Sequence, residues 1–259
     1  MRVFAVSDLH ADLAPNRAWL DDVSATDHTA DTLIVAGDVA DRLPRLAEAL
    51  ALLRRRFAEV FFVPGNHELW ARGGERDSIA KFDAVLRTCA EVGVRTAPGG
   101  AGSAWIVPLF SWYDASFDVR GEAVVEELDA WSDRYFCRWP AGIGPVDRYF
   151  LDMNEGNLVP RGTPVISFSH FVPRTELVPP VRALRFKGLP AVAGSLGIEE
   201  QIRRLGSAVH VFGHTHIPVD RVIDSVRYVQ HYFRPPTADV PLLKEVWPAT
   251  DVTPSHLVW

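Results

Sequence analysis

The sequence predicts an α/β fold, and three features indicate it. Short apolar runs rich in β-branched residues alternate with segments whose apolar residues recur at three-and-four spacing, as strands alternate with helices. Several of the apolar runs end directly at a side chain that could bind a metal ion. The chain has 259 residues, which is long enough for a substantial core, and we expect a single domain over residues 1–259.

The first half of the chain begins with a repeating strand and helix pattern. Residues 2–6 and 32–36 are almost wholly apolar, which is typical of strands that are covered on both faces. Further strands are predicted at 60–63, 94–96 and 104–108, and helices at 16–23, 43–57 and 78–92. Pro64 and Gly65 are expected to end the third strand just before Asn66.

The second half of the chain repeats the pattern after a break. Strands are predicted at 163–169 and 208–213, a helix at 198–205, and a hairpin at 218–229 that turns near Asp224 and Ser225. Residues past Arg234 are rich in proline and are expected to be irregular. Sites in α/β sheets gather at the carboxyl ends of the strands, where the loops meet, so we expect the functional site there.

An aromatic-rich insertion at about 110–160 does not follow this rhythm. Its aromatic residues are interleaved with Asp and Arg and include Trp112, Tyr113, Phe117, Trp131, Tyr135, Phe136, Trp139, Tyr149 and Phe150. The insertion could lie over the site and shape a substrate pocket. Alternatively, the aromatic side chains could pack the core of an ordinary helical appendage.

Composition excludes some classes of function. The net charge of −6 and the lack of a basic stripe disfavour nucleic acid as the main partner. No apolar stretch is long enough for a signal peptide or a membrane span, so we expect a cytoplasmic protein. Cys89 and Cys137 lie far apart without a CxxC pattern, which predicts two thiols that are buried or largely shielded from solvent, and no disulfide framework. The sequence does not indicate an oligomeric state.

Candidate metal ligands occur in five short blocks. They are Asp8-Leu9-His10, Gly37-Asp38, Gly65-Asn66-His67-Glu68, Ser169-His170 and Gly213-His214-Thr215-His216. Carboxylate, amide oxygen and imidazole together suit manganese, iron, zinc or nickel ions, and the lack of a thiolate disfavours a cysteine-rich zinc site. Asp8 and His10 are two residues apart, so an extended loop places both on the same side. Asp38 is a natural bridge between two cations, because a carboxylate has two oxygens.

The order of these blocks resembles the calcineurin-like metallophosphoesterase superfamily over residues 7–216. The resemblance implies a four-layer α/β/β/α sandwich of two mixed β-sheets flanked by helices. It also implies two divalent metal ions per chain, with manganese expected first and iron, zinc or nickel as alternatives. One ion would be held by Asp8, His10, Asp38 and His216, and the other by Asp38, Asn66, His170 and His214.

The same resemblance implies the reaction, which is hydrolysis of a phosphate ester by a hydroxide that bridges the two metals. His67 would stabilise the transition state or protonate the departing oxygen. The run from Gly37 to Arg42 resembles the phosphoprotein phosphatase version of this block, in which Asp41 would orient His67 and Arg42 would bind a phosphate oxygen. Alternatively, Arg42 is a solvated residue of a surface helix.

The sequence also departs from that phosphatase subgroup. Its first block is Ser-Asp-Leu-His, no glycine follows Arg42, and Pro64 stands where the subgroup has arginine. These departures argue against protein Ser/Thr phosphatase activity. Glu68 is expected to support the ligands rather than to bind metal, and His210 to be packed inside its strand.

Three functions are compatible with these residues. We expect a phosphomonoesterase that acts on a phosphorylated small molecule or side chain, because Asp41, Arg42 and His67 resemble a monoester site. The alternative is a phosphodiesterase that acts on a cyclic nucleotide or another diester. Activity on the two kinds of ester would distinguish these functions, because a diester carries less charge than a monoester and gains less from an arginine clamp. An inactive binding scaffold is the third, and it is disfavoured because all seven ligands and His67 are present.

Overall fold

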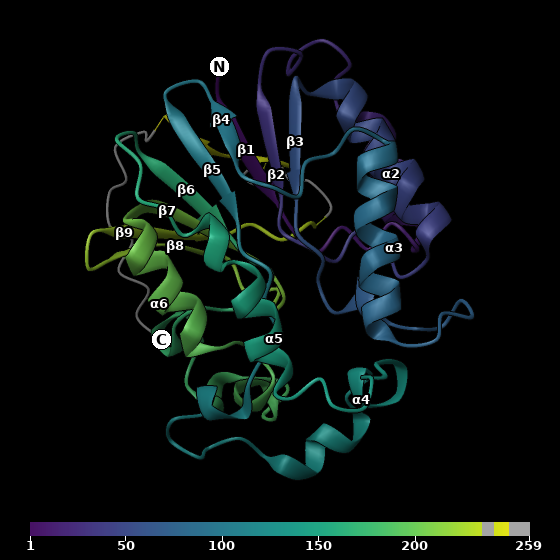
Figure 1. Cartoon of the computed structure of the whole chain (residues 1–259), viewed down its shortest axis with the longest axis vertical. Helices are drawn as coiled ribbons and strands as arrows, with labels where there is room; N and C mark the ends of the chain where they lie inside the picture. The colour runs from purple at the N-terminus through teal and green to yellow at the C-terminus, as the bar shows by residue number, and fades with distance from the viewer. Residues whose placement is uncertain (235–240, 249–259) are drawn as a thin grey trace.

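Two mixed β-sheets stack face to face in the computed structural model, which describes residues 1–234 and 241–248 (Figure 1). The first sheet has four strands in the order β10-β1-β2-β3. Its strands are β1 (Val3–Val6), β2 (Thr32–Val35), β3 (Glu59–Phe62) and β10 (Lys244–Trp247). β1, β2 and β3 are parallel, and β10 pairs with β1 in the antiparallel direction.

The second sheet has six strands in the order β4-β5-β6-β7-β9-β8. Its strands are β4 (Gly99–Ala101), β5 (Ala104–Pro108), β6 (Val165–Phe168), β7 (Ser207–Phe212), β8 (Val219–Ile223) and β9 (Val226–Gln230). The four central strands are parallel, and the two outer strands β4 and β8 pair antiparallel. Parallel strands in both sheets bring several strand ends to one edge, where the loops that follow them can meet.

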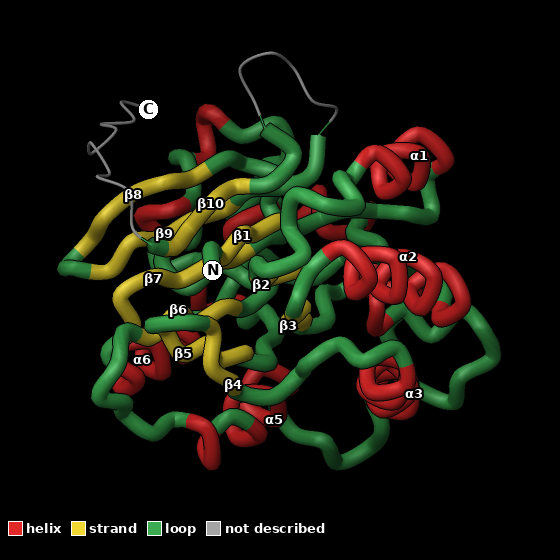
Figure 2. The backbone as a smooth tube through the Cα atoms, turned by 90° about the horizontal axis from the view of Figure 1, so that it is seen from above, coloured by secondary structure: helices red, strands yellow, loops and turns green. Residues whose placement is uncertain are grey.

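Helices cover the outer face of each sheet, which completes the four layers predicted from the sequence (Figure 2). The first sheet is covered by α1 (Ala14–Asp22), α2 (Leu43–Arg56) and α3 (Ser78–Glu91). The second sheet is covered by α5 (Val146–Met153), α6 (Leu196–Leu205) and part of the insertion. No helix among the described residues is both long enough and apolar enough to span a bilayer.

Alternation along each strand divides the core into layers. In β1, Val3 and Ala5 join the cluster between the two sheets, whereas Phe4 and Val6 face the helices of the first sheet. Successive side chains of a strand point to opposite faces, so a strand that is covered on both sides must be apolar throughout. The apolar runs that predicted these strands therefore have a direct structural cause.

Most of the predicted elements are confirmed, with boundaries that differ by a few residues. The predicted hairpin is formed by β8 and β9, and its turn residues Asp224 and Ser225 both have positive φ, as the tight hairpin turns require. The strand predicted at 94–96 is wrong. Arg95 makes only an isolated bridge to Phe61, and the strand lies instead at β4, whose Gly-Gly-Ala sequence has little strand propensity.

The prediction that residues past Arg234 are irregular is wrong at β10. This strand is fixed by its pairing with β1, which lies at the other end of the chain, so no local pattern could reveal it. The other residues to which that prediction applied, 235–240 and 249–259, lie outside the described part of the structure. Cys89 and Cys137 are both free, as expected.

The insertion contains short helices joined by irregular segments. Besides α5, these are η2 (Ala115–Phe117), η3 (Val125–Ala130), α4 (Asp133–Phe136) and η4 (Glu155–Asn157). Trp112, Phe117 and Phe150 are buried in the core cluster beside the second sheet. Shorter 3-10 helices elsewhere are η1 (His67–Leu69), η5 (Thr175–Leu177), η6 (Val181–Ala183) and η7 (Leu189–Ala191).

Candidate metal centre

The predicted ligands follow the carboxyl ends of parallel strands in both sheets. They come after β1 (Asp8, His10), β2 (Asp38), β3 (Asn66), β6 (His170) and β7 (His214, His216). Six of the seven predicted ligands, together with His67, form three groups whose ligand atoms lie within 4.8 Å of one another: Asp8, His10 and His216; His10, Asp38 and His67; and Asp38, His170 and His214. Asp38, the predicted bridge, and His10 each belong to two of these groups.

The backbone at the ligands adopts a conformation that side chains rarely tolerate. Positive φ angles occur at Asp8 (56°), His10 (43°), Asp38 (55°), His214 (76°) and His216 (53°). Such residues persist where the surrounding structure holds them, and they cluster at functional sites. The strain therefore indicates that the loops are shaped to bring these side chains together.

Glycines leave the room that the converging ligands need. A Cβ atom on Gly65 would lie 2.2 Å from Oδ1 of Asp38 and 2.8 Å from the ring of His170. A Cβ atom on Gly37 would lie 2.3 Å from Nδ1 of His170, and Gly37 also has a positive φ of 83°. Any other residue at either position would push a ligand aside.

Hydrogen bonds fix which nitrogen each buried histidine turns toward the centre. Nδ1 of His170 lies 2.8 Å from the carbonyl oxygen of Ala36, and Nε2 of His214 lies 2.9 Å from that of Val192. A carbonyl only accepts, so these nitrogens carry the protons and the opposite nitrogens are free to bind metal. Those free nitrogens lie 3.1 and 3.2 Å from Oδ1 of Asn66.

The other side of the centre is more open. Asp8 is buried and accepts a hydrogen bond from the backbone N–H of His214. Nε2 of His216 lies 3.3 Å from Asp8 and 3.2 Å from Nε2 of His10. The side chain of His216 is 46% exposed, whereas that of His170 is fully buried. A substrate would therefore approach from the side of His10 and His216.

The electrostatics of the centre suit divalent cations. Burial alone would raise the pKa of Asp38, but the imidazoles of His170, His67 and His10 together outweigh burial and hold that pKa well below the ordinary value. The pKa of Asp8 is likewise lowered, against burial, by His216. Burial opposes protonation of His170, yet Asp38 raises the pKa of that ring to about 9, so a cation would take the place of the proton on its second nitrogen. Buried carboxylates that need positive neighbours, with imidazole nitrogens beside them that can bind a cation, form a donor set that fits two metal ions.

Glu68 joins the loops that follow β2 and β3. It is fully buried and accepts backbone N–H groups from Asp38 (2.9 Å), Val39 (2.7 Å), Ala40 (2.9 Å) and Gly65 (2.8 Å). Burial and the nearby Asp38 raise its pKa to about 7. The structure thus confirms the expected supporting role of Glu68, which holds two ligand loops in register.

His67 lies at the edge of the centre, beside the ligands. Its backbone N–H donates to Asp38, and its Nε2 atom lies 3.9 Å from Oδ2 of the same carboxylate. The ring stacks against Trp70, with 3.7 Å between ring centroids. Burial lowers the pKa of His67, and its side chain is 26% exposed. The structure thus places His67 where a substrate on the ions could reach it.

The predicted role of Asp41 beside His67 stays a prediction. The negative charge of Asp41 acts on the His67 ring and works against the burial that lowers the pKa of that ring. The carboxylate of Asp41 forms its ion pair, of 2.9 Å, with Arg72, and within the described part of the chain no hydrogen bond joins it to His67. Arg72 lies beyond the ligand block, and only the fold brings it to Asp41. The side chain of Arg42 is exposed and, among the described residues, makes no hydrogen bond or ion pair, so its role as a phosphate clamp stays a prediction.

Two parts of the insertion reach the centre, which the sequence did not resolve. The rings of Tyr113 and Trp131 lie 6.4 and 5.8 Å from that of His214. Asp133 is buried beside Asn66, and burial raises its pKa although the Asn66 amide opposes this. The insertion therefore lies beside the centre, as one interpretation expected, and its aromatic residues also pack a core, as the other expected. The only local signal for Asp133 was its place in the Trp131-Ser132-Asp133 run of a mostly aromatic segment.

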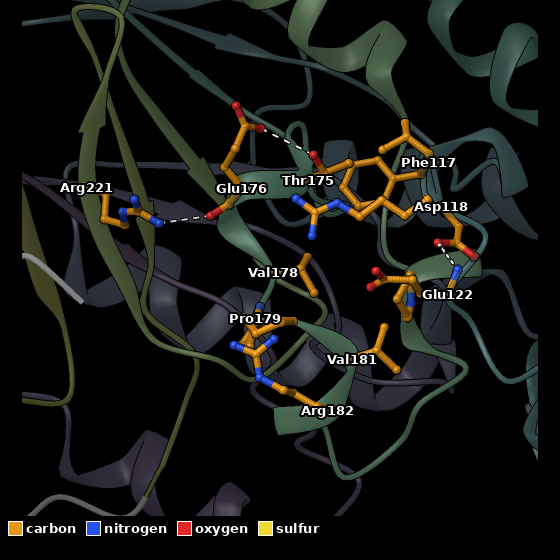
Figure 3. Close-up of a pocket in the computed structure, with 14 residues that line it drawn as sticks. Phe117, Asp118, Glu122, Thr175, Glu176, Val178, Pro179, Val181, Arg182 and Arg221 are labelled. Carbon is orange, nitrogen blue, oxygen red and sulfur yellow. Dashed lines mark hydrogen bonds between the residues drawn. The ribbon is translucent and has the colours of Figure 1, made fainter. Parts of the chain in front are cut away.

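A cavity of about 460 Å³ lies elsewhere, between the insertion and the loop after His170 (Figure 3). Its lining includes Phe117, Val178 and Val181, with Arg120 and Arg182 among its charged residues. None of the predicted metal ligands lines it. The cavity is therefore separate from the residues that could carry out chemistry.

Known proteins are similar to this chain in sequence and in fold. The sequence matches the calcineurin-like phosphoesterase family over residues 1–218, which include all seven predicted ligands. A relative, the acyl-carrier-protein phosphodiesterase PptH of Mycobacterium tuberculosis (strain ATCC 25618 / H37Rv), is 31% identical over an alignment of 251 residues, and the match covers 87% of this chain and 75% of the relative.

Solved structures agree with this result. The crystal structure of the phosphopantetheinyl hydrolase PptH from Mycobacterium tuberculosis matches with a TM-score of 0.77 and 29% identity over 98% of both chains. The protein TT1561 of Thermus thermophilus matches with a TM-score of 0.52 and 14% identity over 88% of each chain, which is a likeness of fold alone.

Proposed function

The chain belongs to the calcineurin-like phosphoesterase family, and on this premise we propose that it hydrolyses the phosphodiester that joins a phosphopantetheinyl group to an acyl carrier protein. The observation that carries the proposal is the similarity to PptH, which extends over most of both chains. Phosphoester hydrolysis itself follows from the family. The choice of a diester and of a carrier protein is the proposed part.

The monoesterase expected from the sequence is the second candidate. It rests on the set formed by Asp41, Arg42 and His67, in which the carboxylate of Asp41 is also engaged by an ion pair with Arg72. The exposed guanidinium of Arg42 still favours it, because a monoester dianion gains more from an arginine than a diester does. The proposed substrate is thus a carrier protein that bears a phosphorylated group, whereas the second candidate would act on a phosphorylated small molecule or side chain.

The proposed mechanism assigns a task to each part of the centre. Asp8, His10, Asp38 and His216 would hold one divalent ion, and Asp38, Asn66, His170 and His214 the other, with manganese as the expected metal. When bound, such ions lower the pKa of water, which supplies a nucleophile near neutral pH, and they offset charge on the phosphoryl oxygens. These seven side chains keep both positions fixed before substrate arrives.

His67 would act on the departing oxygen. Its Nε2 atom lies 3.9 Å from Oδ2 of Asp38 and its side chain is partly exposed, so an N–H at that position could donate to the oxygen as the P–O bond breaks. Trp70 packs against the ring and limits its rotation. One water is consumed: its oxygen would bond to phosphorus as the P–O bond to the leaving group breaks, protonated His67 would give its proton to the departing oxygen, and the proton released by the water would restore His67.

The test is hydrolysis of three substrates by the purified, manganese-loaded chain. We expect release of phosphopantetheine from a phosphopantetheinylated acyl carrier protein, followed by mass spectrometry, and higher activity on an aryl phosphodiester than on an aryl phosphomonoester. Turnover of the monoester alone would support the second candidate instead. No turnover of any of the three with manganese, iron, zinc or nickel would contradict both.

A further inference from the structure

Asp133 belongs to α4 of the insertion, yet its carboxylate is buried against the loop that follows β3. The residue is only 3% exposed. Its Oδ1 atom accepts hydrogen bonds from Nδ2 of Asn66 at 2.9 Å and from Nε1 of Trp70 at 2.7 Å. Its Oδ2 atom accepts one from Nε1 of Trp131 at 3.0 Å. One side chain of the insertion thus contacts two residues of the metal centre.

The bond to Asn66 decides which end of the amide faces the metal position. The amide oxygen and the amide nitrogen have nearly the same shape, but only the oxygen can bind a cation. A carboxylate accepts hydrogen bonds and donates none, so the NH2 group must face Asp133. The oxygen must then face His170 and His214, where it is found at 3.1 and 3.2 Å from their free nitrogens.

The bond to Trp70 acts on the other functional residue of this loop. The indole ring stacks on His67, with 3.7 Å between centroids. Its N–H is held by the same Oδ1 atom that orients Asn66. A displaced carboxylate would therefore release the amide ligand and the ring behind His67 together.

We propose that Asp133 is a positioning residue of the metal centre, which turns the Asn66 oxygen toward the second metal ion and fixes the Trp70 ring behind His67. The insertion thereby completes the metal site, in addition to lying beside it. The inference rests on the metal site of the proposed function and is independent of the substrate.

The test is metal binding by the Asp133→Ala chain, measured by isothermal titration calorimetry and by the electron paramagnetic resonance signal of free manganese. We expect one ion to bind as in the wild type and the other about 10- to 100-fold more weakly, as is typical when a partner of a ligand is lost. With an aryl phosphate substrate, kcat should fall while KM changes little, because the ligand set and His67 are affected rather than an outer contact.

Arg138→Ala is the matched control within the insertion. The Arg138 guanidinium donates to the carbonyl oxygens of Ala71 and Glu75, so it anchors the insertion to the same region without touching a predicted ligand. This chain should bind both ions with wild-type affinity. Equal loss of the second ion in both variants would mean that loosening the insertion is sufficient, and it would overturn the role of Asp133.

A second pair of variants decides the matter if Asp133→Ala does not fold. The oxygen of Asp133→Asn can still accept from Asn66 and Trp70, but its NH2 group then opposes the N–H of Trp131. We expect the second ion to bind about three- to tenfold more weakly, the effect of one lost hydrogen bond, and Trp131→Phe to reverse this in the double variant.

The outcomes separate this inference from the proposed function. Wild-type affinity for both ions in Asp133→Ala would overturn the inference alone, as would a double variant with no recovery. A wild-type chain that binds no divalent ion would overturn the inference together with the proposed mechanism. A carrier protein that is not hydrolysed, with two ions bound and the second lost in Asp133→Ala, would contradict the substrate and support the inference.

Discussion

The ligand loops and the insertion contribute to the same centre in different ways. The loops after β1, β2, β3, β6 and β7 present their side chains through local backbone geometry, with positive φ at five ligands and glycine at Gly37 and Gly65. The insertion is held by tertiary packing of residues such as Phe150 and reaches the centre through a few side chains. The predicted ligands thus belong to short segments that can be recognised locally, whereas the orientation of their side chains depends on distant segments.

The largest expected effect comes from a change in the ligand loops, and it tests whether Asp38 is the carboxylate that both ion positions share. Asp38→Asn removes the charge that both ion positions share, so both ions should bind weakly and phosphoester hydrolysis should fall at least about 10,000-fold, since each ion contributes several kcal/mol. Metal content after dialysis and kcat on an aryl phosphate measure this. Asp129→Asn, an exposed residue of the insertion, is the control and should stay within about twofold. Two tightly bound ions in Asp38→Asn would show that Asp38 is not the bridge.

The next largest effect tests whether His67, at the edge of the ligand loops, acts as a general acid or binds a metal ion. His67→Ala should lower kcat by about 100- to 10,000-fold, the usual contribution of a general acid, while both ions stay bound. His67 also lies in one of the groups whose atoms could hold a metal, together with His10 and Asp38. Loss of one ion in His67→Ala, measured by metal content, would therefore make it a ligand and leave the centre without the assigned acid.

Sequence patterns could predict the loops because their information is local. The apolar runs of β1, β2 and β3 must be covered on both faces, and each ends at its ligand. β4 and β10 could not be predicted in the same way, since their strand state comes from pairing with β5 and β1.

The same limit applies within the centre. The ligand set follows from residue types in order, but the partner of Asp41 and the partner of Asn66 lie 31 and 67 residues away. Arg72 and Asp133 carry no motif of their own, and only the packing of the insertion and of the loop after β3 brings them into place. The sequence therefore predicts which residues are candidate ligands, but it could not predict which distant residues orient them.

A pair of glycine substitutions compares the two regions directly. Gly65→Ala places a methyl group within 2.2 Å of Asp38, so the loop must shift, and the free energy of unfolding should fall by about 1–3 kcal/mol with weaker metal binding. Gly156→Ala, in the insertion, meets no atom within 4 Å, and its φ is not positive. Its effect on unfolding by urea should stay within about 0.5 kcal/mol. Similar losses in both would mean that the loops are no more tightly constrained than the insertion.

The smallest expected effect is a change of folding stability with pH, which arises from a residue in the strands that carry the ligand loops. The segment 110–160 contains no histidine, whereas β7 contains His210, fully buried between the hydroxyl groups of Ser167 and Ser169. Burial lowers the pKa of His210 to about 3. Below the unfolded pKa of about 6.5, the unfolded chain gains a proton that the folded chain does not accept, so this residue lowers stability as pH falls.

Urea unfolding of the metal-free chain at pH 7.5 and pH 5 measures this response. His170 also titrates, because its pKa in the folded chain is raised to about 9. Its contribution to the free energy of unfolding changes mainly above pH 6.5, so it changes little between pH 6.5 and pH 5. Between the two pH values the wild type should lose about 2 kcal/mol more than His210→Gln, whose side chain can still bond to both serines but does not titrate. Equal losses would mean that His210 gains a proton in the folded state, and that the strand beneath His214 is less rigid than the loops it supports.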